Sequence, residues 1–319
     1  MVFDFVNNII GEIIAIKMIS GKRTNIAIIV LLIFFIILFI PCEIHKAYNQ
    51  NKEISNKISF FKPVIDSLIA RGVDSSFVFT LVSHKDTKFN EKYVKINVTG
   101  YLKKPDYSSN YNRRSVRKCR KFYKAHKKLL KDAEQQYGVP ARIITSILWI
   151  ETKFGKYTGK HHLPSVYFST ALASRYEFIQ MNLRELKKHN IRDSVLLDSL
   201  TKKIIQRAEK KSNWALEQIV HLDTADKQLP GTVNEMRGSW AGAFGLCQFI
   251  PSSYVRWAVD GDADGKVDLF NLNDAVHSIA NYLKSNGWTN KYNDKRAALH
   301  HYNNSTQYVN AVLILASRI

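Results

Sequence analysis

The sequence predicts a mainly α-helical protein, and three observations lead to that class. Apolar residues recur at helical spacing in long runs, and the breaker Gly138-Val139-Pro140 separates two of these runs. Only Tyr93–Tyr101 alternates enough to be a strand or an extended arm. No internal repeat or low-complexity tract is evident. The expected helices cover residues 60–71, 75–83, 115–137, 140 to just before Gly155, 163–174, 176–189, 193–221, 273–286 and 306–319, and Pro251 opens a further helix.

Composition restricts the partners. The 319 residues suffice for one large or two modest domains, and 47 basic against 27 acidic residues give a net charge of +20. This favours a polyanion such as nucleic acid, anionic lipid or an acidic cell-wall polymer. Much of the excess lies in Arg113–Lys131, which is either the solvated face of a long helix or an electrostatic footprint on an anionic matrix. Because no nucleic-acid motif accompanies it, nucleic acid is not expected as a partner.

An uninterrupted apolar run, Ile26–Ile40, predicts a membrane or export segment over residues 25–41. Lysines and an arginine precede it, so residues 1–24 are expected in the cytoplasm and the rest outside, in the periplasm or cell envelope. Three alternatives remain open. The first is an uncleaved anchor that attaches the chain to a membrane. The second is a cleaved signal peptide, which a translation start at Met18 would give a conventional basic N-terminal region. The third is a lipoprotein signal ending at Cys42.

The exported part divides into two regions on composition. Residues 47–112 mix polar runs with short apolar patches and end in the turn-forming Pro105–Asn112, so they are expected to be an accessory or linker region. Residues 115–319 are expected to form the main, helical domain. Three cysteines do not make a disulfide framework, and Cys247 is expected to be a buried thiol.

One acid lies on an apolar helix stripe. Glu151 follows Ile147 by four residues and Leu148 by three, so it continues their face of the helix that begins at Pro140. Desolvation there raises a carboxyl pKa and keeps the group protonated near neutral pH, as a general acid requires. The alternative is a buried structural glutamate paired with a lysine or arginine.

A second segment, Gly238–Tyr254 (GSWAGAFGLCQFIPSSY), combines glycines with polar and aromatic side chains. Ser239 and Gln248 supply hydrogen-bonding groups, while Trp240 and Phe244 supply apolar faces. That mixture suits a sugar, which stacks on aromatic rings and is bound at its polar edges. The alternative is a glycine-rich turn between core helices.

These segments resemble the lytic murein transglycosylase B family, glycoside hydrolase family 103. Tyr137–Gly155 (YGVPARIITSILWIETKFG) is similar to its catalytic-glutamate helix, and Gly238–Tyr254 to its next motif. Ala258–Val276 (AVDGDADGKVDLFNLNDAV) resembles its metal loop, and Ile279–Trp288 and His301–Ile319 its C-terminal motifs. The resemblance follows the family's motif order from about residue 120 to the end.

The resemblance implies a lysozyme-like catalytic domain over residues 115–319 and an enzyme that cleaves peptidoglycan strands without water. Glu151 would be the single catalytic acid and base, and 1,6-anhydromuramic acid ends would form. The implied substrate-binding residues are Ser239, Gln248, Tyr282, Tyr302 and Asn303. One departure is Cys247, where the family has a small residue, and this side chain is expected to narrow the cleft.

An acidic loop, Asp260–Asp268, has the ligand pattern of an EF-hand. Oxygen ligands occupy positions 1, 3, 5 and 9, glycine occupies position 6 and a backbone carbonyl position 7. Position 12 is Asn271, so Asp274 is expected to close a longer loop. The sequence therefore predicts a structural calcium held by Asp260, Asp262, Asp264, Lys266, Asp268 and Asp274, and no cofactor for the chemistry. The alternative is an Asp/Gly turn without metal.

Two rival functions remain open. A hydrolytic muramidase would need a second carboxylate across the cleft, for which Asp223, Asp226 and Glu177 are candidates. An inactive peptidoglycan-binding scaffold would keep the cleft without turnover. Zinc and serine-hydrolase chemistry lack their motifs, and the sequence does not set the oligomeric state.

Overall fold

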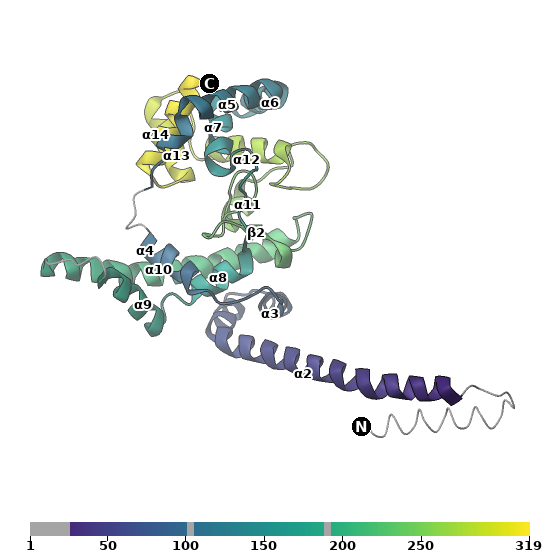
Figure 1. Cartoon of the computed structure of the whole chain (residues 1–319). Helices are drawn as coiled ribbons and strands as arrows, with labels where there is room; N and C mark the ends of the chain where they lie inside the picture. Colours follow the sequence, from purple (N-terminus) through teal and green to yellow (C-terminus); the bar gives the residue numbers. More distant parts are fainter. Residues whose placement is uncertain (1–25, 101–104, 188–192) are drawn as a thin grey trace. The chain divides into compact units, whose positions relative to one another are not determined.

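The computed structural model describes residues 26–100, 105–187 and 193–319, with side chains from residue 48 onward (Figure 1). The chain divides into two compact units, Met1–Asn56 and Lys57–Ile319. The first helix, α2 (Ile26–Ala70), belongs to both.

The predicted membrane segment falls largely outside this description. Residues 1–24 lie beyond the described residues, and only the helical backbone of Ile26–Ile40 is described. Among the residues that the structure describes, none of the helices has both the length and the apolar character that crossing a bilayer demands.

The first short helices follow the chain's capping residues. α3 (Ser75–Ser83) has the expected bounds and begins where the Asp74 carboxylate accepts a hydrogen bond from the Phe77 amide. The predicted strand or arm at Tyr93–Tyr101 is wrong, because α4 (Glu91–Thr99) forms there. Asn90 caps it, and the aliphatic side chains of Val94 and Val98, one turn apart, are buried together.

The basic segment forms two helices where one was predicted. α5 (Arg113–Ala125) and α6 (Lys127–Tyr137) meet at His126, which is not helical. Gly138 then ends α6 in the left-handed conformation (φ 71°), and α7 (Ala141–Thr152) begins after Pro140. A short 3₁₀ turn, η2 (Ser108–Tyr111), precedes α5 in the expected linker.

The remaining elements are mainly helical, as predicted. The expected helices appear as α8 (Leu163–Ala171), α9 (Tyr176–Lys187), α10 (Ser194–Asp226), α11 (Pro251–Trp257), α12 (Leu272–Ser285) and α14 (Thr306–Arg318). Four further elements were not predicted from the sequence: α13 (Tyr292–Tyr302), the 3₁₀ turn η3 (Val233–Glu235), and the strands β1 (His161–His162) and β2 (Arg237–Gly238). The two strands pair antiparallel, with His161 opposite Gly238.

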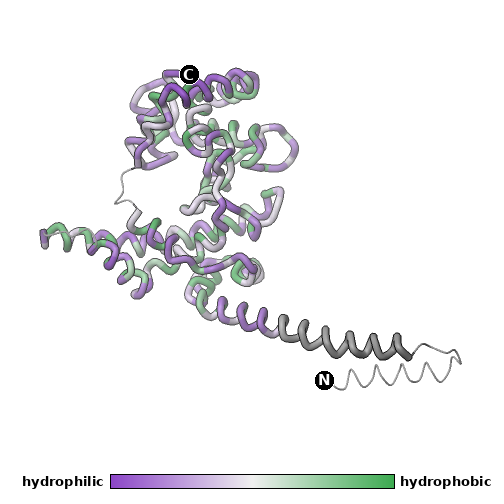
Figure 2. Tube along the Cα trace, in the orientation of Figure 1, coloured by the Kyte–Doolittle hydropathy of each residue, from purple (hydrophilic) through white to green (hydrophobic). Residues whose placement is uncertain are grey.

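The helices pack in two groups, one around α7 and one on α10. Most of α7 is buried, and α5, α6, α12 and α14 pack around it. A second group of helices, α4, α8, α9 and α11, packs on α10. Figure 2 shows hydrophilic and hydrophobic residues alternating along most of these helices, as expected when each buries one face. Residues 57–112 are part of the same compact unit as the rest.

Candidate active site

Glu151 is held on the last turn of α7, the most buried helix of its group. The residues before it, Ile147 to Ile150, are buried, whereas Glu151 itself is partly exposed. Desolvation raises the pKa of Glu151 to about 7, and two smaller effects oppose it: a hydrogen bond from the Tyr308 hydroxyl and the charge of Lys153. No salt bridge involves Glu151 in the described part of the chain, which argues against a structural ion pair.

Tyr308 is one of the two residues whose side chains lower the pKa of that carboxyl. Its ring is buried, and its hydroxyl has no hydrogen-bond partner of regular geometry among the described residues. The hydroxyl nevertheless lies close enough to Glu151 to lower the pKa of that carboxyl, the effect expected of a hydrogen-bond donor. A buried hydroxyl without another partner is therefore available to Glu151 when that group loses its proton.

The end of α7 is turned sharply beneath the acid. Lys153 and Phe154 are left-handed, with φ of 54° and 61°, and the Phe154 amide donates to the Leu148 carbonyl at 3.2 Å. The Lys153 ammonium donates to the Asn110 side chain and to the Trp149 carbonyl, so it does not pair with Glu151. The helix thus ends at Thr152, before the predicted Gly155.

The glycine-rich loop is fastened to this helix end. Thr152 donates its hydroxyl to the Leu246 carbonyl at 3.0 Å. Within the loop, Phe244 and Phe249 exchange backbone hydrogen bonds of 2.8 and 3.1 Å. The loop is therefore a structured wall beside the acid.

Gly242 shows why this loop needs glycine. It has φ 90°, and a Cβ there would lie 2.3 Å from the Tyr167 hydroxyl oxygen. That hydroxyl donates to the Gly242 carbonyl at 2.8 Å, so the backbone must come close to the ring. Tyr167 in α8 thereby supports the loop from beneath.

Between the two groups of helices lies a cleft of about 1050 Å³ that contains Glu151. Its wall comes from α4, α7, α10, the glycine-rich loop and the turn between α13 and α14. Among the described residues that line it, Glu151 is the only carboxylate. Asp223, Asp226 and Glu177 are not in its wall. Asp226 instead accepts the Val233 amide, and Glu177 pairs with Arg175 at 2.8 Å.

Four of the five predicted substrate-binding residues line this cleft: Ser239, Gln248, Tyr302 and Asn303. The Gln248 amide nitrogen donates to the Thr158 and Gly245 carbonyls, which orients its side chain. The Tyr302 hydroxyl donates to the Cys247 carbonyl at 2.6 Å, leaving the tyrosine ring as its contribution to the wall. The Ser239 oxygen accepts from the Ala243 amide at 3.1 Å.

The structure places two residues away from the cleft wall. Tyr282 is buried behind Tyr302, with ring centroids 4.9 Å apart, and donates its hydroxyl to the His301 carbonyl. Cys247 is fully buried, as expected, and is not among the lining residues, so its side chain does not narrow the cleft.

Several lining residues were not selected from the sequence. Trp240 is 46% exposed and offers a flat apolar face to the cleft. Lys211 and Arg207 enter from α10, and burial lowers the pKa of Lys211 to about 8. Trp240 is predicted from the sequence as an apolar face for a sugar, but it is not among the predicted substrate-binding residues. The sequence does not distinguish Arg207 and Lys211 from the other basic residues of α10, so it could not identify them as cleft residues.

The acidic loop brings three carboxylates together. Ligand oxygens of Asp260, Asp262 and Asp274 lie within 4.8 Å of one another. Burial and the two neighbouring carboxylates raise the pKa of Asp274, whereas backbone amides lower that of Asp260. Gly265 at position 6 has φ 85°, as the tight turn of such a loop requires. Three oxygen donors of this kind fit a hard cation such as Ca²⁺.

The side chains of Asp264 and Asp268 are not part of this cluster of carboxylates. The Asp264 carboxylate accepts the Lys266 amide at 2.8 Å, and the Asp268 carboxylate accepts the Phe270 amide at 2.8 Å. Asn271 and Asn273 both donate to Asp262, at 2.8 and 3.3 Å. The expectation that Asp274 closes a longer loop agrees with this geometry, and the full ligand set remains a prediction.

A mainly helical fold with one desolvated glutamate in a polar and aromatic cleft defines the lysozyme-like class. The family model for the transglycosylase SLT domain matches residues 82–298. The chain belongs to this family.

Known proteins agree with that assignment. The membrane-bound lytic murein transglycosylase B of Escherichia coli K12 is 30% identical over 167 residues, which are 52% of this chain and 37% of the relative. The matched region thus spans little more than a third of that relative's length.

Solved structures share the fold. The soluble lytic transglycosylase SltB1 of Pseudomonas aeruginosa superimposes with a TM-score of 0.61 at 18% identity, covering 81% of this chain and 97% of that one. The E. coli lytic transglycosylase SLT35, solved in complex with calcium, gives 0.59 at 21% identity, covering 81% and 91%.

Proposed function

We propose that the protein is a lytic transglycosylase that cleaves the β-1,4 bond between N-acetylmuramic acid and N-acetylglucosamine in peptidoglycan. The observation that carries this proposal is Glu151, the one carboxylate among the described residues that line the cleft, whose pKa of about 7 leaves it substantially protonated at neutral pH. A protonated acid is what departure of a glycosidic oxygen requires.

The chemistry needs one carboxylate because the nucleophile is part of the substrate. Glu151 donates its proton to the glycosidic oxygen, and the acetamido oxygen of the muramyl residue stabilises the positive anomeric carbon. The ionised Glu151 then accepts the proton of the muramyl C6 hydroxyl, whose oxygen closes on C1. A tethered nucleophile replaces water, and the product is a 1,6-anhydro end.

The polar wall positions the strand for these steps. Ser239, Gln248, Tyr302 and Asn303 surround Glu151 in the cleft, and the exposed Trp240 ring offers a stacking face. Tyr282 supports this wall from behind through its contact with Tyr302. The absence of a second carboxylate from the described lining residues favours this route over hydrolysis.

We also propose that the acidic loop holds a structural calcium and that the enzyme acts outside the cytoplasm, attached to a membrane through residues 25–41. The clustered carboxylates of Asp260, Asp262 and Asp274 support the first proposal, together with the calcium in the SLT35 structure. The apolar run Ile26–Ile40 and the membrane-bound relative support the second.

Digestion of purified peptidoglycan tests the activity. The full chain should release fragments with anhydromuramic acid ends, and Glu151→Gln should lower the rate by about 10² to 10⁴, the usual contribution of a general acid. Glu177→Gln, outside the cleft, is the matched control and should act like the wild type. Mass spectrometry of the ends decides the outcome: reducing ends would indicate a muramidase, and no release by the wild type a scaffold.

A further inference from the structure

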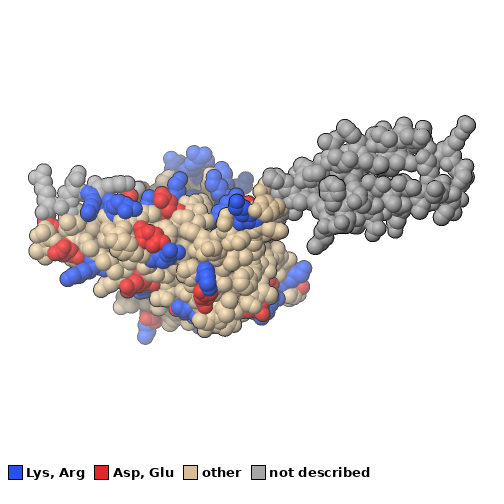
Figure 3. Space-filling view, turned by 90° about the horizontal axis from the view of Figure 1, so that it is seen from below, with Lys and Arg blue, Asp and Glu red and all other residues tan. Residues whose placement is uncertain are grey.

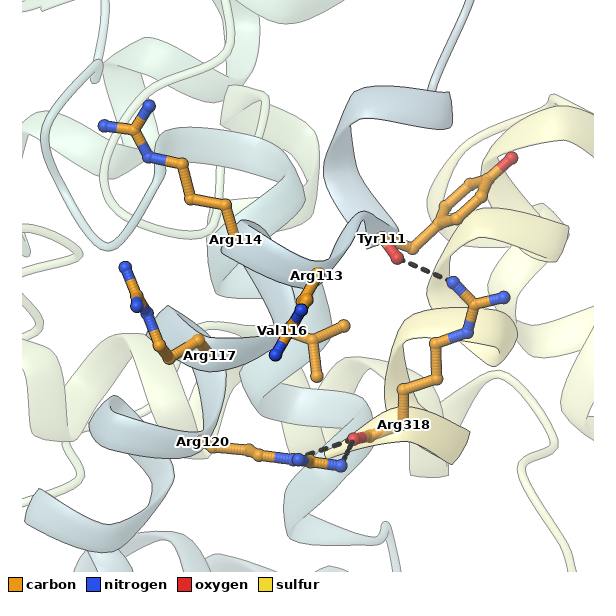
Figure 4. A pocket seen from close by; sticks show the side chains of 7 residues that line it. All are labelled: Tyr111, Arg113, Arg114, Val116, Arg117, Arg120 and Arg318. Carbon is orange, nitrogen blue, oxygen red and sulfur yellow. Dashed lines mark hydrogen bonds between the residues drawn. The ribbon is translucent and has the colours of Figure 1, made fainter.

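A second pocket, of about 840 Å³, lies between α5, η2 and α14 (Figure 4). It is lined by Tyr111, Arg113, Arg114, Val116, Arg117, Arg120 and Arg318, and we refer to it as the arginine pocket. It shares no lining residue with the cleft that contains Glu151. The proposed glycan cleavage therefore does not account for its cluster of arginines.

Two of the arginines build the frame of the pocket. Arg120 donates from Nε and Nη2 to the Arg318 carbonyl, at 3.0 and 2.6 Å. Arg318 in turn donates to the Tyr111 carbonyl at 2.7 Å, and its guanidinium carbon lies 5.5 Å from the centre of that ring. Figure 4 shows these contacts joining α5 and η2 to α14. They fix the geometry before any ligand arrives.

The other three arginines have no partner. Within the described parts of the chain, Arg113, Arg114 and Arg117 make no hydrogen bond and no ion pair, and all three are exposed. The segment Arg113–Lys131 contains no Asp or Glu. Like charges one turn apart, such as Arg113 and Arg117, destabilise a helix. By contrast, Figure 3 shows acidic and basic residues interspersed over another face of the molecule.

The type of cation differs between the two sides of α5. Every basic residue of the arginine pocket is an arginine. A neighbouring pocket of about 600 Å³ on the same helix is lined instead by lysines: Lys118, Lys121, Lys153 and Lys156. A guanidinium presents two parallel N–H groups that match two oxygens of one anion, which an ammonium does not. The segregation points to a planar, bidentate contact in the arginine pocket.

We propose that the arginine pocket binds a phosphate group. Arg113, Arg114 and Arg117 supply three uncompensated guanidiniums, which suit a tetrahedral group of several oxygens and more than one negative charge. The pocket includes the first residue of α5, Arg113, where the positive end of the helix dipole adds to the field. The phosphate is either that of an anionic lipid head group or that of a soluble compound, and the two are separable by experiment.

Titration of the full chain with inorganic phosphate tests the site. The protein is kept in a zwitterionic detergent at constant ionic strength, and heat of binding is measured. The test variant is Arg113→Gln/Arg117→Gln, which spares the frame built by Arg120. The control is Lys118→Gln/Lys121→Gln, which removes the same charge from the same helix outside the arginine pocket.

The wild type and the lysine variant should bind phosphate saturably, and the arginine variant about tenfold or more weakly. An equal loss of phosphate affinity in both variants would mean that net charge alone causes binding, which would overturn the proposal. Binding to the wild type that does not saturate with phosphate concentration would also overturn it. Circular dichroism verifies folding. If the double variant is unfolded, Arg117→Gln alone gives the same comparison.

Flotation with vesicles identifies the source. The full chain is mixed with phosphatidylcholine vesicles, with or without phosphatidylglycerol, and the N-terminal apolar run is the same in all variants. Extra binding to phosphatidylglycerol by the wild type and the lysine variant, but not by the arginine variant, assigns the site to a lipid head group. Phosphate binding without that extra affinity assigns it to a soluble phosphate.

Discussion

The pKa of the Glu151 carboxyl is set by opposing effects of its surroundings. Burial on α7 favours the neutral acid, whereas the Tyr308 hydroxyl and Lys153 favour the carboxylate, and the balance is a pKa of about 7. A general acid and base needs both states within reach at neutral pH. Because Tyr308 lacks another hydrogen-bond partner among the described residues, its role can be tested by removing one oxygen atom.

Tyr308→Phe should move the alkaline limb of activity to higher pH. In the proposed mechanism cleavage requires protonated Glu151, so kcat/KM should fall as pH rises through the pKa of about 7. The Tyr308 hydroxyl lowers this pKa. Its removal should therefore move the alkaline limb of the pH profile upward by roughly half a pH unit to one pH unit, the equivalent of one modest hydrogen bond. The pH profile of peptidoglycan cleavage measures the shift.

Tyr292→Phe is the matched control, since Tyr292 is 65% exposed and lies outside the cleft lining. Its profile should coincide with that of the wild type. A limb that stays in place in Tyr308→Phe would show that the hydroxyl does not act on Glu151.

At the scale of the elements, the acidic loop between α11 and α12 is where the proposed calcium would matter most. Its clustered carboxylates repel one another, and Asp274 is buried with a raised pKa. A cation would offset both effects. Asp262 is the best position for a test, because it is exposed, whereas Asp260 and Asp274 also accept backbone amides.

Calcium should raise the melting temperature of the wild type, and Asp262→Asn should remove most of the rise. At a hundredfold excess over Kd, binding to the folded state contributes about 3 kcal/mol, or several degrees in a domain of this size. Thermal melts with calcium and with excess chelator measure it. Asp198→Asn, an exposed acid on α10, should keep the full rise, and a wild type indifferent to calcium would refute the site.

At the scale of the whole molecule, the cleft exists only where separate helices meet. Glu151 comes from α7, Lys211 from α10 and Asn303 from the end of α13. With Glu151 neutral, Arg207 and Lys211 make this cleft positive, which suits a glycan that carries carboxylates. The charge of the cleft therefore suits an anionic strand.

Lys211→Met should raise KM with little change in kcat, because this cation attracts the strand without touching the reacting atoms. Loss of one charged contact corresponds to roughly a tenfold rise. Steady-state digestion of soluble glycan strands separates the two constants. Lys210→Met is the control, since Lys210 is exposed and does not line the cleft. An unchanged KM in Lys211→Met would exclude the contact.

Prediction from the sequence succeeded where the signal is local. The bounds of α3 follow from its cap, and α7 from Gly138, Pro140 and its apolar stripe. It failed at α4, where Val94 and Val98 pack on α10 and override the alternating pattern. It could not distinguish Tyr302, in the cleft wall, from Tyr282 behind it, because only packing separates the two rings.

The sequence by itself determined the helical class, the place of Glu151 on an apolar helix face and the acidic loop, since period, capping and motif spacing are properties of neighbouring residues. Only the tertiary structure decided the pKa of Glu151, that no second carboxylate lies among the described residues of the cleft wall, and that Lys211 and Trp240 line the same cleft. The physical reason is that desolvation and charge act through space, and the groups that cause them come from segments far apart along the chain.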